Sequence, residues 1–329
     1  MMNIEQSNST AIHRLAGLFA LAATTFITSC HGGDWDLPTR LAPLRISPAP
    51  GTYLDPNQEI TITSPDPGVT IKYTTDGTNP LYTGSTRFYT GPLRLGGWGV
   101  VELRAYAIDA DSRSPVDSAR YVFPVPWTSP SSVVWGNLTS GGRTYRTVTL
   151  GSQTWMAENL DDAGLSGYAG VCNRGDTVYC HQYGRYYTWA EAMGLAGGYN
   201  AVKWSGSDRM HRGICPSGWH IPNDSDWNVL FAWVNTTTNA ATPGRYLKST
   251  NGWSAGAGVD QFGFRVLPSA NLYTISNTAT MGGFGMFWSA TESSTGSFAG
   301  AVDFPSGGDS IMVVSNEKPD RLNIRCLMD

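Results

Sequence analysis

Alternation of apolar and polar residues predicts two strands in the first third of the chain. Residues 69–74 alternate strictly between apolar and polar side chains, the period of a half-buried strand. Residues 101–107 repeat the pattern, with Tyr106 on the polar face. Asp76-Gly77 marks a turn after the first run. Short strands separated by Gly and Pro over residues 46–124 predict an antiparallel β-sandwich.

The clearest helix signal lies in the second half of the chain. Pro222 ends a stretch that Pro and Gly keep out of helix. Asn223 is a good N-cap, and Asp226 stands three residues later, as in a capping box. The apolar positions that follow have helical spacing: Trp227, Val229, Leu230, Trp233 and Val234. We expect a helix that starts here and buries an aromatic face.

Other segments of the second half predict a mixed architecture. Residues 145–150 and 153–159 flank Gly151-Ser152 and predict a hairpin whose Gly suits a type II′ turn. Residues 186–193 predict a first helix, ended by the glycines from Gly194 onward. Short apolar runs among glycine-rich loops follow. A Pro/Ser-rich stretch, residues 125–134, predicts an extended linker between the two halves.

Composition narrows the class of protein. Over 329 residues the net charge is −4 and charged residues make up only 15%, so nothing favours binding to nucleic acid. The chain holds 38 Gly, 19 Pro and 12% aromatic residues, a composition typical of a loop-rich extracellular protein.

The N-terminus predicts export and lipid anchoring. Residues 1–29 contain Arg14 and an apolar run, residues 15–26, which is too short to span a membrane comfortably. Ile27-Thr28-Ser29-Cys30 resembles the lipobox of bacterial lipoproteins, which implies acylation of Cys30. Residues 30–45 would then be a tether, and His31 favours sorting to the outer membrane, with the protein exposed at the surface. The alternative is an ordinary cleaved signal with Cys30 incidental.

The predicted sandwich resembles a known accessory module. Residues 48–53, 71–80 and 103–107 are similar to the chitobiase/β-hexosaminidase C-terminal-type domain. The resemblance implies an immunoglobulin-like fold without catalytic activity. We interpret Asp76 as a turn residue rather than a catalytic acid. Asp109 and Asp111 are not followed by the further oxygen ligands that a calcium-binding loop needs, so a solvated turn is expected there.

The second half, residues 135–329, resembles the Fibrobacter succinogenes major paralogous domain. Five ordered motifs carry this resemblance: residues 154–160, 183–189, 215–222, 287–292 and 324–326. The arrangement of two helices, irregular loops and a closing C-terminal strand is similar to the C-type lectin-like fold. The expected fold class is therefore an all-β immunoglobulin-like sandwich followed by an α+β, lectin-like domain.

The cysteines fit an oxidising compartment. We pair Cys172 with Cys180, and Cys215 with Cys326; the second pair matches the places of a bond in the lectin-like fold. The alternative is a metal site made of Cys172, Cys180 and His181, which lacks the spacing of known zinc sites. We therefore expect no metal and no cofactor.

Tryptophan supplies the candidate binding residues. Trp204 and Trp253 lie in Gly/Ser-rich loops and are the candidates for exposed ligand contacts. Five others lie within the family motifs and are expected in the core: Trp155, Trp189, Trp219, Trp227 and Trp288. His211 and His220 are expected to be hydrogen-bonded structural histidines. The adhesion-type tripeptide Arg174-Gly175-Asp176 is discounted because it is short.

Three functions remain open at this stage. The first is a non-catalytic surface lipoprotein that binds a polysaccharide or a surface protein and contacts the membrane through its lipid anchor. The second is a structural or assembly component of the envelope. The third is an enzyme on a formylglycine-generating-enzyme-like fold. The chain lacks an H-E-x-x-H motif and a phosphate loop, and its one acidic cluster, Glu158 with Asp161 and Asp162, is expected to be a solvated loop.

Overall fold

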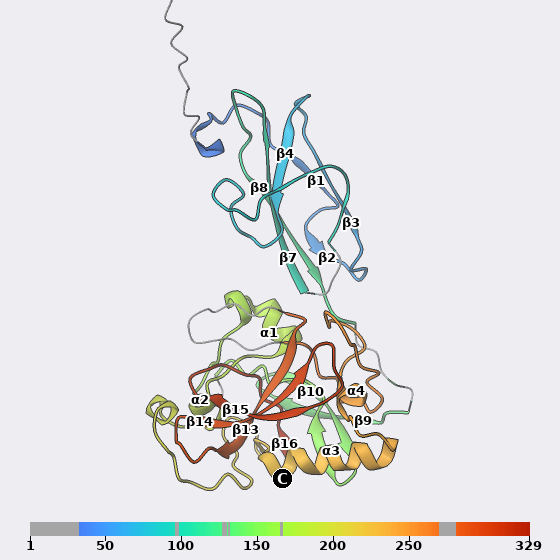
Figure 1. Cartoon of the computed structure of the whole chain (residues 1–329), viewed down its shortest axis with the longest axis vertical. Helices are drawn as coiled ribbons and strands as arrows, with labels where there is room; N and C mark the ends of the chain where they lie inside the picture. Colours follow the sequence, from blue (N-terminus) through green and yellow to red (C-terminus); the bar gives the residue numbers. More distant parts are fainter. Residues whose placement is uncertain (1–32, 96–98, 127–129, 131, 165–166, 270–280) are drawn as a thin grey trace, which may run out of the picture.

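The computed structural model describes residues 33–95, 99–126, 130, 132–164, 167–269 and 281–329. Two modules follow one another along the long axis of the molecule (Figure 1). The predicted signal peptide, residues 1–29, and the predicted lipidation site Cys30 lie outside the described residues. Among those described, no helix has the length and apolarity that a membrane crossing requires.

The first module is a sandwich of a three-stranded and a five-stranded sheet, in the orders β1-β3-β6 and β2-β8-β7-β4-β5. All neighbouring strands are antiparallel except β2 and β8. The strands are β1 Arg45–Ser47, β2 Gly51–Thr52, β3 Glu59–Thr63, β4 Thr70–Thr74, β5 Arg87–Phe88, β6 Leu93–Arg94, β7 Gly99–Ile108 and β8 Asp117–Phe123. The two predicted strands, β4 and β7, lie side by side in the larger sheet, and the sandwich prediction is confirmed.

Tyr106 departs from the predicted alternation. It lies on the polar face of β7 yet is fully buried. The cause is a short 3₁₀ helix, η1 (Asp34–Asp36), whose Asp34 carboxylate accepts a hydrogen bond of 2.5 Å from the Tyr106 hydroxyl. A segment that precedes the first strand of the sandwich therefore covers part of its outer face, which a period-two pattern does not show.

The second module combines two further sheets with short helices, in the strand orders β12-β16-β11-β10-β9 and β13-β14-β15. Its strands are β9 Trp135–Ser140, β10 Arg143–Leu150, β11 Gln153–Met156, β12 Trp219–His220, β13 Phe284–Glu292, β14 Phe298–Pro305, β15 Met312–Glu317 and β16 Leu327–Met328. The predicted hairpin is β10–β11, with Gly151 at φ +62° as a type II′ turn requires. Strand β16, at the C-terminal end of the second module, lies between β12 and β11, which come much earlier in the sequence.

The helices are α1 Thr177–Tyr183, α2 Trp189–Ala192, α3 Asp224–Thr238 and α4 Gly244–Leu247, with 3₁₀ turns η2 Asn173–Gly175 and η3 Gly197–Asn200. Helix α3 begins with the predicted capping box: Asn223 accepts from the Asp226 amide, and Asp226 accepts from the Asn223 amide. Its Trp227, Leu230 and Val234 are buried as expected, but Val229 is 46% exposed and does not belong to the buried face.

The first predicted helix is shorter than expected. Helix α2 begins at Trp189 rather than at residue 186, because the backbones of Tyr186 and Tyr187 form bridges to Val171 and Leu322. Thr188 and Glu191 form the capping box that starts the helix.

Both disulfides are present with the pairing expected from the sequence. Cys172–Cys180 closes a separation of 8 residues, and Cys215–Cys326 spans 111 residues. The longer bond fastens the residue before β16 to the loop before β12. It therefore reinforces the same sheet that the late strand β16 completes.

The start of the predicted linker packs against the second module. Val125 is buried and packs with Tyr179, Tyr183 and Leu267 of the second module. Residues 127–129 and 131 of this stretch lie outside the described residues. The start of the linker is thus part of the contact between the modules.

Candidate functional site

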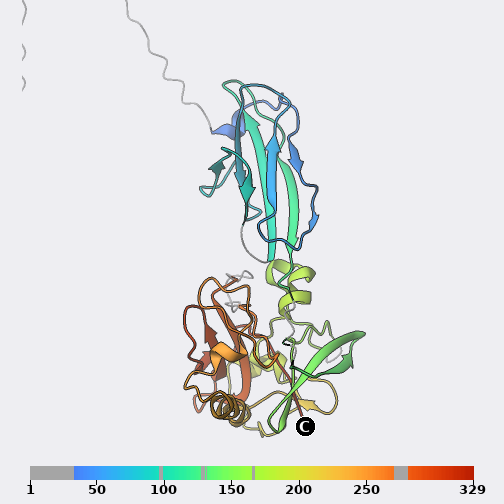
Figure 2. The same cartoon turned by 90° about the vertical axis from the view of Figure 1, so that its right-hand side faces the viewer.

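Helix α1 connects the two modules. Its Tyr179 hydroxyl donates to the carbonyl oxygen of Val100 in β7 at 3.2 Å. Arg120 of β8 forms an ion pair with Asp176, the N-cap of α1. Figure 2 shows α1 directly beneath the long strands of the sandwich. These contacts hold the first module against one side of the second.

The adhesion-type tripeptide is engaged in this junction. Arg174 donates to the carbonyl oxygen of Asp76 in the first module at 3.2 Å. Asp176 accepts from the Val178 amide at 3.0 Å in addition to pairing with Arg120. Its side chains are thus committed to structural contacts, which supports discounting it as an adhesion motif.

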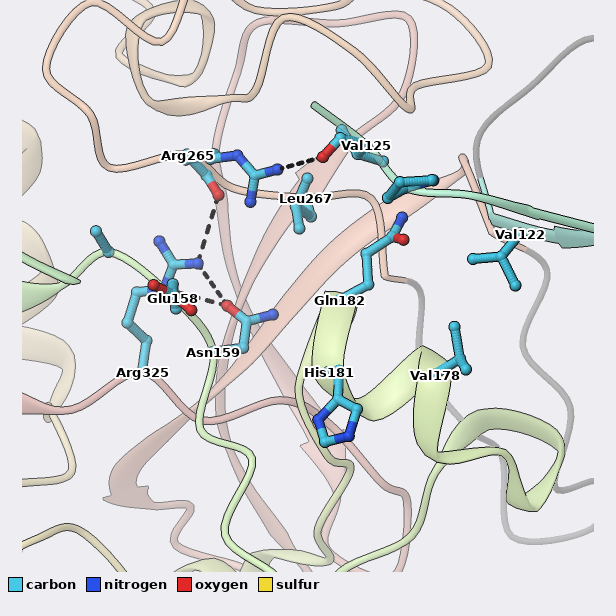
Figure 3. Close-up of a pocket in the computed structure, with 12 residues that line it drawn as sticks. Val122, Val125, Glu158, Asn159, Val178, His181, Gln182, Arg265, Leu267 and Arg325 are labelled. Carbon is cyan, nitrogen blue, oxygen red and sulfur yellow. Dashed lines mark hydrogen bonds between the residues drawn. The ribbon is translucent and has the colours of Figure 1, made fainter. Parts of the chain in front are cut away.

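A pocket of about 300 Å³ lies at the junction (Figure 3). Both modules and α1 contribute apolar walls: Val122, Pro124, Val125, Ala157, Val178 and Leu267. The polar lining consists of Glu158, Asn159, His181, Gln182, Arg265 and Arg325. Apolar walls with a few polar groups, at a boundary between domains, are typical of ligand sites.

Arg325 forms one wall of the pocket and is almost completely buried. Its Nε donates to Asn159 Oδ1 at 3.2 Å, and its other nitrogens donate to Asn159 and to the carbonyl oxygen of Phe264. The guanidinium carbon lies 4.6 Å and 5.2 Å from the ring centroids of Phe264 and Phe287. Neutral oxygens and aromatic faces therefore hold this cation.

Arg265 joins the second module to the start of the linker. Its Nη2 donates to the carbonyl oxygens of Val125 at 3.0 Å and Pro126 at 3.3 Å. The residue has φ +52°, a left-handed conformation that is unusual for a non-Gly residue. The carboxylate of Asp260 supports it by accepting from the Arg265 amide at 2.8 Å.

The arginines leave positive charge beside the pocket. Burial lowers the pKa of Arg325 to about 9, and repulsion by Arg265 contributes. Burial likewise lowers the pKa of Arg265 to about 10. Both values are above neutral pH, so both side chains remain charged. Burial also raises the pKa of Asp260 to about 7, so this carboxylate neutralises them only in part at neutral pH.

Helix α1 supplies two further polar groups, His181 and Gln182. Figure 3 shows Gln182 extending from α1 toward Val125 and Leu267, with His181 at the preceding position of the helix. The buried Nε2 of Gln182 forms no well-formed hydrogen bond within the described residues. His181 is exposed and its Nδ1 lies 2.9 Å from Asp161. The α1 side of the pocket can thus offer hydrogen-bond donors to a ligand.

The acidic cluster is not the solvated loop that the sequence predicted. The Asp161 side chain is only 4% exposed and contacts Arg143 at 2.6 Å and Arg185 at 2.9 Å. Glu158 pairs with Arg143 at 3.1 Å, and Asp162 is buried. Arg143 of β10 and Arg185 after α1 neutralise Asp161, and Arg143 also pairs with Glu158. The arrangement stabilises the structure and does not form a pair of free carboxylates.

The two candidate tryptophans are half-buried and lie apart. Trp204 packs edge-on against Trp189 and His211, with ring centroids 6.3 Å and 4.8 Å away. Trp253 donates from its indole nitrogen to Ser249 at 3.0 Å. Each ring belongs to a different core cluster. The structure does not bring them together into one groove, and neither lines the junction pocket; their role as ligand contacts stays a prediction.

Comparison with known families agrees with this architecture. The family model of the Fibrobacter succinogenes major domain matches residues 148–327, more than half of the chain. The chain belongs to the Fibrobacter succinogenes major domain family. The model of the chitobiase/β-hexosaminidase C-terminal domain matches residues 48–118. No curated protein and no solved structure matches the chain.

The motifs that resemble the Fibrobacter succinogenes major domain contribute large aromatic side chains to the core of the second module. The five tryptophans expected in the core are at most 4% exposed: Trp155, Trp189, Trp219, Trp227 and Trp288. His220 and His211 are hydrogen-bonded, to Asp329 and to the carbonyl oxygen of Met193, both at 2.8 Å. The motifs therefore account for the fold of the second module.

The remaining candidates behave as structural residues. Asp76 accepts from the Thr78 amide at 3.0 Å, and Asp109 accepts from the Asp111 amide at 2.9 Å, as turn residues do. Cys172 and Cys180 are bonded to each other. Nowhere in the described ranges do three or more His, Cys, Asp or Glu side chains gather as a metal site would need.

The sequence reasoning missed the arginines of the pocket. Arg265 interrupts the apolar run of residues 262–268, and Arg325 interrupts that of residues 322–328. A lone arginine within a run predicted to be buried signals a buried cation that needs oxygen or aromatic partners. That signal was in the sequence, but it could not show that Arg265 contacts the linker or that both residues line one pocket.

Proposed function

We propose that this protein is a non-catalytic binding protein of the bacterial cell surface, and that the junction pocket is its ligand site. The ligand is a polysaccharide whose sugar units carry carboxylate groups. The pocket supports this proposal, because it combines apolar walls from both modules with one side that is lined by two charged arginines, Arg265 and Arg325. A sugar ring would lie against the apolar walls, and its carboxylate would face the cations.

The proposed context is that of a lipoprotein. Acylation at Cys30 would hold the chain at the membrane, and the sandwich would separate the second module from it. Two disulfides support a location outside the reducing cytosol.

A lectin-like fold for the second module is part of the proposal. The disulfide Cys215–Cys326 spans 111 residues and links the residue before the closing strand β16 to the loop before β12. The module also contains helices, irregular loops and two sheets. This order of parts supports a C-type lectin-like arrangement. The binding chemistry would differ from that of calcium-dependent lectins, because the pocket presents arginines and amides rather than a set of carboxylates.

The test is binding of a soluble form that begins at residue 31 to polygalacturonate and alginate, compared with neutral dextran. Calorimetry should show saturable binding to the acidic polymers that weakens with salt, since charge contributes to it. Val178→Phe fills the pocket from α1 and should abolish this binding. Thr177→Phe, which places the same ring on the exposed neighbouring position, should leave it unchanged.

Equal binding by the Val178→Phe variant and the native protein would contradict the pocket as the ligand site. Lack of binding to every polymer would instead support the structural envelope role, in which the junction only fixes the two modules. Cross-linking on intact cells would then identify the neighbours of the protein.

A further inference from the structure

A group of large aromatic side chains is exposed on the first module. Trp35 in η1, Tyr82 in the loop after β4 and Phe88 in β5 are 49%, 67% and 64% exposed. The rings of Trp35 and Tyr82 lie with their centroids 6.0 Å apart and their planes tilted by 36°. We call these three residues the aromatic platform. Large apolar side chains gathered in one exposed patch mark interaction sites more often than isolated ones do.

Lys72 connects the parts of the platform. Its ammonium group pairs with Asp34 at 2.5 Å and lies 5.4 Å from the centroid of the Phe88 ring. Asp34 also accepts from the Tyr106 hydroxyl at 2.5 Å. The short helix η1, and with it Trp35, is therefore fixed to the outer face of the five-stranded sheet. The platform is held in place by contacts beneath it while its rings face water.

Gly33 positions the Trp35 ring. A Cβ atom added to Gly33 would lie 1.9 Å from the six-membered part of the indole. The ring therefore folds back over the backbone at this position and needs a residue without a side chain there. The backbone φ of Gly33 is −59°, which every residue can adopt, so the requirement comes from the ring and not from the backbone conformation.

We propose that the aromatic platform binds a neutral polysaccharide through its sugar rings. Pyranose rings are flat, have apolar C–H faces and carry hydroxyl groups at their edges, so they can stack on aromatic faces while the hydroxyls reach nearby polar groups. Lys72 and Asp34 are such groups, and because they pair with each other they add no net charge. Tilted neighbouring rings suit successive sugar units that are rotated against each other along a chain.

The local charges favour a neutral partner over a membrane surface. The cation of the platform is already paired, and the exposed carboxylate of Asp36 lies beside Trp35 in η1. Arg87 precedes Phe88 in β5 and, by the alternation of a strand, points to the opposite side. Anionic lipid surfaces attract proteins through unpaired lysine and arginine. The platform offers aromatic area without that attraction.

The platform is separate from the junction pocket. Figures 1 and 2 both show η1 on the flank of the first module, away from α1 and the second module. The two sites also differ in chemistry, since the pocket contains two charged arginines and the platform contains a neutral ion pair. One site can therefore be tested without disturbing the other.

The experiment is a depletion isotherm of the soluble form that begins at residue 31 on particles of cellulose, chitin and mannan. The native protein should bind at least one of them. The triple variant Trp35→Ala, Tyr82→Ala, Phe88→Ala should bind at least about tenfold more weakly, the sum expected for three aromatic contacts. Gly33→Ala keeps all three rings but displaces Trp35, and should weaken binding by a smaller factor.

Matched controls separate the platform from general surface effects. Phe284→Ala removes an aromatic ring that is 45% exposed on the second module, and Leu54→Ala removes an apolar side chain that is 81% exposed on the first. Both should bind as the native protein does, as should the pocket variant Val178→Phe. Melting temperatures should agree among all variants of exposed residues.

Three results would overturn the proposal. One is a native protein that binds none of the neutral polysaccharides. Another is a triple variant with unchanged affinity for them. The third is an effect on lipid alone: if the triple variant loses binding to vesicles of phosphatidylcholine and phosphatidylglycerol while its affinity for the particles stays native, the platform is a membrane contact.

Discussion

Lys318 and Glu292 form an ion pair in which the lysine side chain has no exposure to solvent and the glutamate has 9%. The same ammonium group donates to the carbonyl oxygens of Tyr199 at 3.1 Å, Val202 at 3.2 Å and Gly296 at 2.6 Å. One buried cation therefore connects the end of η3, the loop after it, and the turn between β13 and β14.

Replacing Lys318 by methionine should destabilise the protein strongly. The substitution keeps most of the side-chain volume but leaves the Glu292 carboxylate buried without its partner, which typically costs about 3–5 kcal/mol. Urea unfolding measures the effect. The exposed Lys203 provides the control, since Lys203→Met should change stability by less than about 0.5 kcal/mol. Adding Glu292→Gln to Lys318→Met should recover part of the loss, and an unchanged unfolding midpoint for Lys318→Met alone would contradict the argument.

The two disulfides should differ in their effect on stability. Alanine at both Cys215 and Cys326 opens a loop of 111 residues and should lower the free energy of unfolding by about 4–5 kcal/mol on the chain-entropy argument. Alanine at both Cys172 and Cys180 opens a loop of only 8 residues, so the same argument gives a loss of about 2–3 kcal/mol. Denaturant titration of both variants gives the order. A larger loss from the short loop would show that strain or local packing decides instead.

His220 should make stability depend on pH near neutrality. Burial lowers its pKa, but hydrogen bonds and charge from Asp226 and Asp329 outweigh this, so the net pKa lies above the ordinary value of 6.5. The folded state therefore binds the proton more tightly than the unfolded state. The stabilisation is complete below pH 6.5 and disappears as the pH rises through the folded pKa.

The variant His220→Gln tests this sign. Melting temperatures of both proteins should be measured between about pH 5 and 9. The advantage of the native protein should be largest at acidic pH and should shrink as the pH rises. A difference that grows with pH would mean that the buried imidazole is neutral in the folded state.

The junction between the modules should loosen when its direct links are removed. The variant Arg120→Ala, Tyr179→Phe deletes the ion pair with Asp176 and the hydrogen bond to Val100. Nitroxide labels at Leu54→Cys and Val313→Cys, both exposed positions, report the distance between the modules in the soluble form that lacks Cys30. The distance distribution should broaden.

Arg94→Ala is the control for this measurement. It removes an exposed ion pair with Glu59 inside the first module, so the distribution should keep its native width. An equally narrow distribution for the junction variant would show that the apolar contacts around Val125 hold the modules without these polar links.

Local signals in the sequence predicted the elements whose cause is local. The capping box of Asn223 and Asp226 set the start of α3, and strict alternation identified β4. Helix α1 was missed because its seven residues, rich in β-branched and aromatic types, have weak helix propensity. Its N-cap Asp176 was visible only as part of the adhesion-type tripeptide.

Features that depend on distant partners could not be predicted. The neutralisation of Asp161 requires Arg143 and Arg185, and the burial of Tyr106 requires Asp34. The junction pocket is of the same kind, because its walls come from β8, the linker, α1 and three loops of the second module. The spacing of residues along the sequence does not show which distant residues contact each other. The pocket could therefore be identified only in the folded structure.

The place of β16 has a consequence for how the protein is made. A chain that leaves the ribosome or a translocation channel from its N-terminus exposes residues 45–123 early, and these contain every strand of the first module. The five-stranded sheet of the second module must wait for Leu327, which pairs with both Trp155 and His220. The sandwich can therefore fold while the rest of the chain is still emerging, whereas the second module stays incomplete and accessible to chaperones until nearly all of the chain has emerged.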